Sequence, residues 1–152
     1  MSRRLLTGIA LLSLVLVPAT AGLAQDIGPD MGTELVSATD HPTLGLILAD
    51  ANGLTLYNWA GDTQGTSNCS GACPTAWPPA LVDEGNAMHL MDMSAGLGTV
   101  QRSDGTYQLA MDGWPLYRFQ RDMQRGDANG EGLNAFGALW SVVKVDAMTE
   151  DM

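Results

Sequence analysis

The pattern Tyr-x-aromatic-x-x-Asp occurs twice in this chain, and the duplication constrains the fold more than any single residue does. The first copy occupies residues 57–62 (Tyr-Asn-Trp-Ala-Gly-Asp) and the second residues 117–122 (Tyr-Arg-Phe-Gln-Arg-Asp). The similarity extends upstream, where Asn52-Gly53 aligns with Asp112-Gly113. An internal repeat predicts an architecture of two equivalent units, so the repeated residues can serve packing as well as chemistry.

The first 24 residues have the features of a cleaved signal peptide. A basic start is followed by an apolar stretch over residues 5–17 and by small residues at the expected cleavage site. We expect residues 25–33 to form a flexible segment and residues 147–152 a tail. No cysteine lies near the expected cleavage site, which argues against a lipid anchor there, and no second apolar run reaches membrane-spanning length. The sequence therefore predicts a periplasmic or secreted protein without a transmembrane segment.

The charge of the chain limits its partners. Its formal net charge is −10 at pH 7, and such an acidic protein repels phosphate backbones, so nucleic acid is not an expected partner.

Turn signals between short apolar runs predict a β fold. Asn52-Gly53 separates two such runs, which is a strong hairpin signal, and Asp104-Gly105 and Asp112-Gly113 join three further runs into a meander. We expect additional strands over 34–38 and 139–145. The prediction is one all-β domain over residues 34–146, a small antiparallel sheet or sandwich with long braced loops. It is built from two intertwined repeats, at about 34–82 and 97–146.

The same residues resemble a known family. The duplicated motif, the loop from Cys69 to Cys73, the Trp77-Pro78-Pro79 run and the segment from Gly126-Asp127 to Trp140 are together similar to the secreted-repeat family. Its members are exported bacterial proteins, many of them lipoproteins, with a Tyr-x4-Asp motif and no known function. The resemblance implies an exported protein and supplies no activity.

The motif residues have two interpretations. Acid–base or ligand-binding pairs could be made by Tyr57 with Asp62 and by Tyr117 with Asp122. A structural interpretation is favoured, because a carboxylate at a strand end can accept backbone N–H groups of a turn and a tyrosine hydroxyl. The aromatic residues of the motif, Trp59 and Phe119, are expected to pack in the core with the tyrosines.

The two cysteines, Cys69 and Cys73, are expected to form a structural disulfide after export to an oxidising compartment. Thiol–disulfide redox activity is a weaker alternative, because such activity favours a Cys-x-x-Cys spacing at a helix N-terminus.

A cluster of Met88, His89, Met91 and Met93 is the main metal candidate. Thioethers and imidazole suit Cu(I), so periplasmic copper binding, with His41 as a further ligand, is the alternative function. The competing interpretation is that the methionines fill gaps in the core.

The sequence signals for other functional sites are weak. Asp127-x-Asn129-x-Glu131-Gly132 resembles the start of a calcium loop, but Ala138 stands where a bidentate carboxylate is needed. We find no recognisable catalytic arrangement in the sequence. We therefore expect a non-enzymatic binding or interaction module of the cell envelope, without a cofactor, whose partner or small ligand the sequence does not name.

Overall fold

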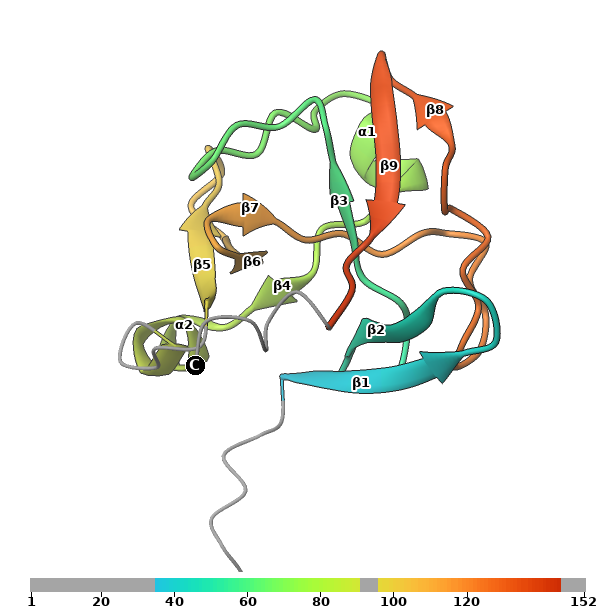
Figure 1. Ribbon diagram of the computed structural model, residues 1–152. Coiled ribbons are helices and arrows are strands. Elements are labelled where there is room, and N and C mark those ends of the chain that lie inside the picture. Colours follow the sequence, from blue (N-terminus) through green and yellow to red (C-terminus); the bar gives the residue numbers. More distant parts are fainter. Residues whose placement is uncertain (1–34, 91–95, 146–152) are drawn as a thin grey trace, which may run out of the picture. The chain divides into compact units, whose positions relative to one another are not determined.

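The strands that the structure describes are short, and they assemble into three small antiparallel sheets. The computed structural model describes residues 35–90 and 96–145, which all lie in one compact unit of the chain (Figure 1). The elements are β1 (Val36–His41), β2 (Gly45–Asp50), β3 (Tyr57–Trp59), α1 (Cys73–Ala76), β4 (Leu81–Val82), α2 (Glu84–Leu90), β5 (Leu97–Gln101), β6 (Tyr107–Met111), β7 (Trp114–Pro115), β8 (Asn134–Ala135) and β9 (Ala138–Val142).

The sheet topology follows the turn signals. β1 pairs with β2, β9 lies between β3 and β8, and β6 lies between β4 and β5 while also pairing with β7. The turns at Gly53, Gly105 and Gly113 all use positive φ values of 84°, 86° and 80°, which glycine adopts without a steric penalty. The predicted all-β class is confirmed, and each predicted turn lies between paired segments of the chain.

The apolar runs that follow the turns at Gly53 and Gly113 are regular strands only at Tyr57–Trp59 and Trp114–Pro115, because the chain changes its pairing partner there. Leu56 still donates its N–H to Leu48 of its own hairpin at 2.9 Å, whereas Tyr57 donates to the Tyr117 carbonyl at 2.8 Å. In the second repeat, the Leu116 N–H donates a hydrogen bond within its own hairpin, and the Tyr117 N–H donates to the Tyr57 carbonyl at 2.9 Å. Each motif strand therefore leaves its own repeat and crosses to the other.

The strands that return from the long loops are also exchanged. Ala80 of the first repeat donates to Leu116 at 3.0 Å, and Val143 of the second donates to Leu56 at 3.0 Å. Likewise β9, from the second repeat, pairs with β3 from the first, and β4, from the first, pairs with β6 from the second (Figure 1). The two repeats are thus intertwined, and each completes the sheets of the other.

The centre of the molecule is an aromatic cluster to which both repeats contribute. Trp77 and Trp140 stack with ring centroids 3.8 Å apart and planes only 2° apart. Phe119 stacks on Trp77 at 4.2 Å, and Trp59 stacks on Trp140 at 5.4 Å. The rings of this stack are buried, and interlocked aromatic rings of this kind dominate the packing energy of a small core.

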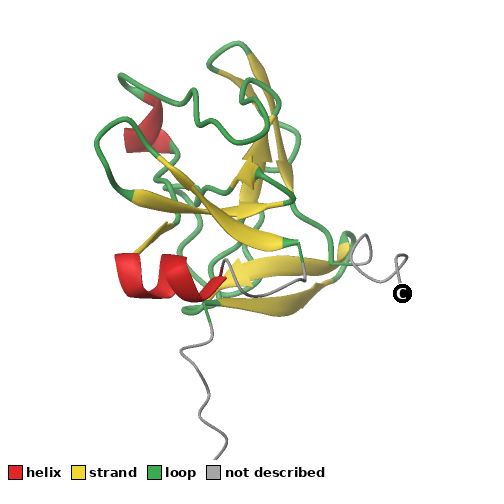
Figure 2. Ribbon diagram, turned by 90° about the vertical axis from the view of Figure 1, so that its left-hand side faces the viewer, coloured by secondary structure: helices red, strands yellow, loops and turns green. Residues whose placement is uncertain are grey.

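Among residues 35–90 and 96–145, two short helices, which the sequence analysis did not predict, lie at the edge of the strand assembly (Figure 2). The first helix, α1, has Pro74 in its first turn, where proline's missing N–H costs nothing. At the start of α2, Asp83 Oδ1 accepts the N–H of Asn86 at 2.8 Å, which is an N-cap interaction. Within the described residues, neither helix is long and apolar enough to cross a membrane.

Candidate functional site

Tyr57 is fully buried and joins the two repeats through its hydroxyl group. The hydroxyl donates to Asp122 Oδ2 at 2.5 Å and accepts the Gly130 N–H at 3.2 Å. The other oxygen of Asp122 accepts the backbone and side-chain N–H groups of Asn129 at 3.0 and 3.1 Å. The carboxylate therefore holds both the turn of its own loop and the tyrosine of the other repeat.

This geometry corrects the pairing considered from the sequence. Tyr57 does not hydrogen-bond Asp62, and Tyr117 does not hydrogen-bond Asp122. The pairs are exchanged because each motif strand crosses to the other repeat before its loop begins, which brings the tyrosine of one copy to the aspartate of the other.

The second pair, Tyr117 with Asp62, has the same placement and a different bonding pattern. Asp62 Oδ1 accepts the Asn68 N–H at 2.7 Å, the counterpart of the bond to Asn129. The Tyr117 hydroxyl hydrogen-bonds Ser67 Oγ at 2.7 Å. Tyr117 and Asp62 lie close enough to influence each other's pKa, but they form no hydrogen bond, and Asp62 Oδ2 is buried with no hydrogen-bond partner among the described residues.

Arg102 links this pair to the sheet of the second repeat. Its Nη1 donates to Gln108 Oε1 at 2.6 Å and to Ser67 Oγ at 2.8 Å, and its Nη2 donates to the Cys69 carbonyl at 3.3 Å. Gln108 is fully buried and donates in turn to the Leu116 carbonyl at 2.7 Å. The network satisfies polar groups that would otherwise be buried without a partner, and it braces the first long loop.

The titration of the two motif tyrosines does not suit a catalytic base. Burial, reinforced by the hydrogen bond to Asp122, raises the pKa of Tyr57 far above its ordinary value. Burial and the charge of Asp62 likewise raise the pKa of Tyr117. A tyrosine that stays protonated at neutral pH cannot act as a base, and neither side chain is open to solvent.

The predicted disulfide between Cys69 and Cys73 is present. The two Cα atoms are 5.4 Å apart, and both residues are buried against the aromatic cluster. The bond closes the turn that leads into α1 and fixes the loop that carries Trp77 into the core.

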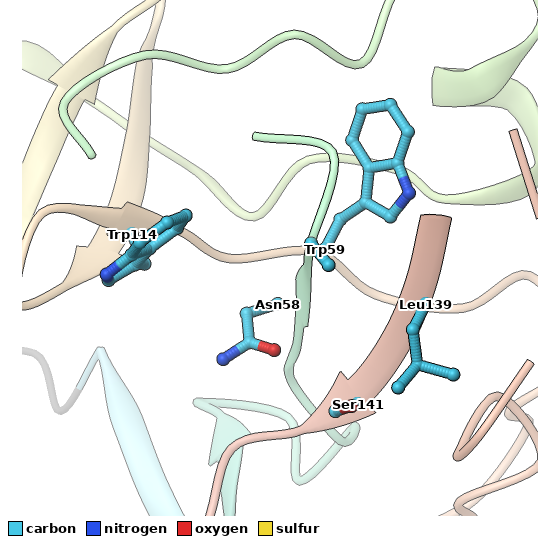
Figure 3. Close-up of a pocket in the computed structure, with 6 residues that line it drawn as sticks. Asn58, Trp59, Trp114, Leu139 and Ser141 are labelled. Carbon is cyan, nitrogen blue, oxygen red and sulfur yellow. The ribbon is translucent and has the colours of Figure 1, made fainter. Parts of the chain in front are cut away.

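One open concave feature of the described surface is a shallow pocket of about 230 Å³. Asn58 and Ser141 line it from the paired strands β3 and β9, and Trp114 lines it from β7. Figure 3 shows Trp114 and Leu139 on opposite sides of Asn58, while the Trp59 side chain extends away from it. Of the lining residues, sequence reasoning selected Trp59, as a core residue of the motif, and it did not select Asn58, Ser141 or Trp114, although Trp114 directly after a predicted Asp-Gly turn was a visible signal.

Comparison with known proteins gives one match. Residues 38–81 and 98–144 match a family described as a secreted repeat of unknown function. The chain belongs to this family. The two matched segments coincide with the two structural repeats, and the resemblance stated from the residues is confirmed at the level of the family. No curated protein and no solved structure matches significantly.

The calcium-like segment of this secreted-repeat protein is not arranged as a cation site. Asp127 Oδ2 accepts the N–H groups of Met123 and Gln124 at 2.8 and 3.1 Å, which lowers the pKa of Asp127. Glu131 Oε2 accepts the Val142 N–H at 2.6 Å. The carboxylates are thus bonded to different stretches of backbone, and the described residues contain no group of three or more His, Cys, Asp or Glu side chains that could hold a metal.

The Met/His cluster stays a prediction. Met88 and His89 lie in the last turn of α2, whereas Met91 and Met93 lie outside the described residues, as do the expected signal peptide, flexible segment and tail. At His41, Nδ1 accepts the Leu44 N–H at 3.2 Å. A competition titration with Cu(I) checks the copper hypothesis. Equal affinity of the parent and of a variant with the three methionines changed to leucine would contradict it.

Proposed function

We propose that this secreted-repeat protein is a non-enzymatic binding module that holds its ligand in the pocket beside Trp114. The motif residues are better explained as structural elements, because both tyrosines are fully buried and both aspartates are hydrogen-bonded to the turns of their loops. A ligand would therefore contact the surface of the intertwined repeats and not the motif tyrosines and aspartates.

The exposure of Trp114 is the observation that carries this proposal. Its side chain is 39 % exposed, whereas the other three tryptophans are at most 7 % exposed. Tryptophan is the side chain most often found at binding hot spots, because it combines a large apolar area with low flexibility. A rigid aromatic group beside a hollow, with polar groups nearby, is the usual composition of a small binding site.

The strands around the pocket are well placed to hold a fixed shape. Asn58 and Ser141 are cross-strand partners in the β3–β9 pair, and Trp59, between Asn58 and the loop, is anchored by its stack on Trp140. A site on paired strands above an aromatic core is pre-organised, so little conformational entropy is lost when a ligand binds.

A fragment screen by NMR tests the proposal. Neutral and charged fragments are titrated into the labelled protein, and the backbone and indole N–H resonances of the pocket residues are followed. We expect these resonances to shift at the lowest fragment concentrations, and we expect the shifts to disappear in Trp114→Ala. Leu81→Ala is the matched control, because Leu81 is 47 % exposed on β4 and does not line the pocket. Fragments that bind elsewhere, or equally well to Trp114→Ala, would refute the proposal.

A further inference from the structure

The pocket breaks the internal symmetry of the fold. The counterparts of Trp114, Asn58 and Ser141 in the other repeat are Leu54, Arg118 and Pro78, by the alignment of the two motif strands and the two return strands. At that second position Arg118 Nε forms an ion pair with Asp50 Oδ2 at 2.8 Å.

This difference shows which residues around the pocket are not needed for the packing of the fold. The same backbone arrangement forms with leucine, arginine and proline at the equivalent positions. The intertwined fold therefore does not itself require an exposed tryptophan, an amide and a hydroxyl on this side. Residues that a fold does not require, and that gather around a hollow, point to a ligand.

The polar groups of the pocket are available. The amide of Asn58 and the hydroxyl of Ser141 make no side-chain hydrogen bond to any described residue, and both residues are half-buried. They come from directly opposed positions of β3 and β9, so they lie on the same face of the strand pair. Neither group is among the described buried polar atoms that lack a partner, so both reach solvent and are free to hydrogen-bond a ligand that carries hydroxyl or amide groups.

The pocket is also neutral in a strongly acidic chain. Its lining consists of Asn, Trp, Ala, Leu and Ser residues and includes no charged side chain, while the chain as a whole carries −10. Phosphate or carboxylate ligands would find no cation in the pocket and would be repelled by the rest of the protein. A cationic ligand would find no carboxylate in the lining.

We propose, building on the proposed function, that the pocket binds a neutral sugar ring. The C–H face of a pyranose packs against the exposed indole of Trp114, with Leu139, 46 % exposed, on the far side of Asn58. Its hydroxyl groups exchange hydrogen bonds with the Asn58 amide, which donates and accepts, and with the Ser141 hydroxyl. The volume of about 230 Å³ lies below the roughly 300–1,000 Å³ that is usual for ligand pockets, so the pocket suits one ring of a glycan rather than a larger enclosed ligand. A proline-rich peptide is a poorer fit, because such peptides bind grooves lined by several aromatic side chains.

Titration with methyl β-glucoside, methyl β-galactoside and N-acetylglucosamine, monitored by NMR on the full chain, tests this assignment. A single ring makes few contacts, so we expect a dissociation constant on the order of 1 mM for the best sugar. Binding should weaken about tenfold or more in Trp114→Ala, as for loss of a central anchor, and should be partly restored in Trp114→Phe. Asn58→Leu should also weaken it, Leu81→Ala should not, and glucuronate should bind less well than the glucoside.

The outcomes separate this assignment from the binding-module proposal. If none of the three sugars shifts the pocket resonances while other fragments do so through Trp114, the sugar assignment is wrong and the pocket is still a binding site. A proline-rich peptide that binds through Trp114 where the sugars fail also overturns the sugar assignment and leaves the binding site in place. If sugars bind equally to the parent and to Trp114→Ala, the assignment is again wrong.

Discussion

Replacement of Tyr57 by phenylalanine tests the central structural claim, that the two repeats are held together by exchanged motif residues. The substitution keeps the ring and its edge contacts with Trp77 and Phe119, whose centroids lie 5.3 and 6.3 Å away. It removes only the hydroxyl group, which donates to Asp122 at 2.5 Å and accepts from Gly130 at 3.2 Å.

The expected cost follows from these two bonds. A hydrogen bond to a charged group contributes about 1.5–3 kcal/mol, and a neutral one about 0.5–1.5 kcal/mol. Tyr57 is 0 % exposed, so water cannot easily replace the lost hydroxyl. Asp122 keeps its bonds to Asn129, which limits the loss. We therefore expect Tyr57→Phe to lower the free energy of unfolding by about 2–4 kcal/mol.

Urea denaturation measures this change through the midpoint, provided that the slope of the transition is unchanged. Tyr107→Phe is the matched control, because the Tyr107 hydroxyl makes no hydrogen bond to any described residue, and it should change stability by less than about 0.5 kcal/mol. A double-mutant cycle between Tyr57→Phe and Asp122→Ala should give a coupling of about 0.5–3 kcal/mol. The same cycle with Asp62→Ala should be additive to within about 0.5 kcal/mol. Coupling of Tyr57 to Asp62 instead of Asp122 would refute the exchanged pairing.

Three further changes test the packing, the loop brace and the buried carboxylate, each by urea denaturation. A Cβ at Gly130 would lie 2.5 Å from a stacked tryptophan ring, so Gly130→Ala should destabilise by about 1–3 kcal/mol, whereas Gly98→Ala, with open space around it, should be nearly neutral. Equal effects of the two would contradict the tight fit. Changing Cys69 and Cys73 to alanine opens a short ring and should cost about 2 kcal/mol, which the reduced parent should reproduce. Burial raises the pKa of Asp62 above 3.8, so the folded state holds a proton that the unfolded chain releases just above that pH. The free energy of unfolding should therefore contain a component that falls as pH rises through that window, and Asp62→Asn should lack it; identical pH profiles would exclude the effect.

Much of the fold could be predicted from local signals. Asn52-Gly53, Asp104-Gly105 and Asp112-Gly113 require turns because their glycines adopt positive φ, and each turn indeed separates paired strand segments. The disulfide could be predicted from export and spacing, because two cysteines four residues apart have few other partners. The cap at Asp83 could also have been recognised, but a seven-residue helix has too few turns to show a clear period.

The exchange of partners could not be predicted in the same way. Nothing local to Tyr57 distinguishes a bond to Asp62, five residues away, from a bond to Asp122, 65 residues away. The choice depends on which strand each backbone N–H meets, and that is decided by long-range pairing. The pocket was missed for a related reason, because Trp114 and Ser141 become neighbours of Asn58 only once β3, β7 and β9 are assembled.

The exchange also explains why the motif is duplicated. If the second copy were absent, the Tyr57 hydroxyl would lack the Asp122 carboxylate, and the backbone of Tyr57 would lack its two hydrogen bonds with Tyr117. Each copy is complete only in the presence of the second, so the repeated residues are required by the assembly of the two halves whatever the protein binds. The positions where the repeats differ are free of that requirement. One such difference lies at two equivalent positions: Arg118 forms an ion pair with Asp50, whereas Asn58 lines the pocket beside Trp114. In a fold of intertwined repeats, the function is therefore better sought where the symmetry fails than in the motif that defines the repeat.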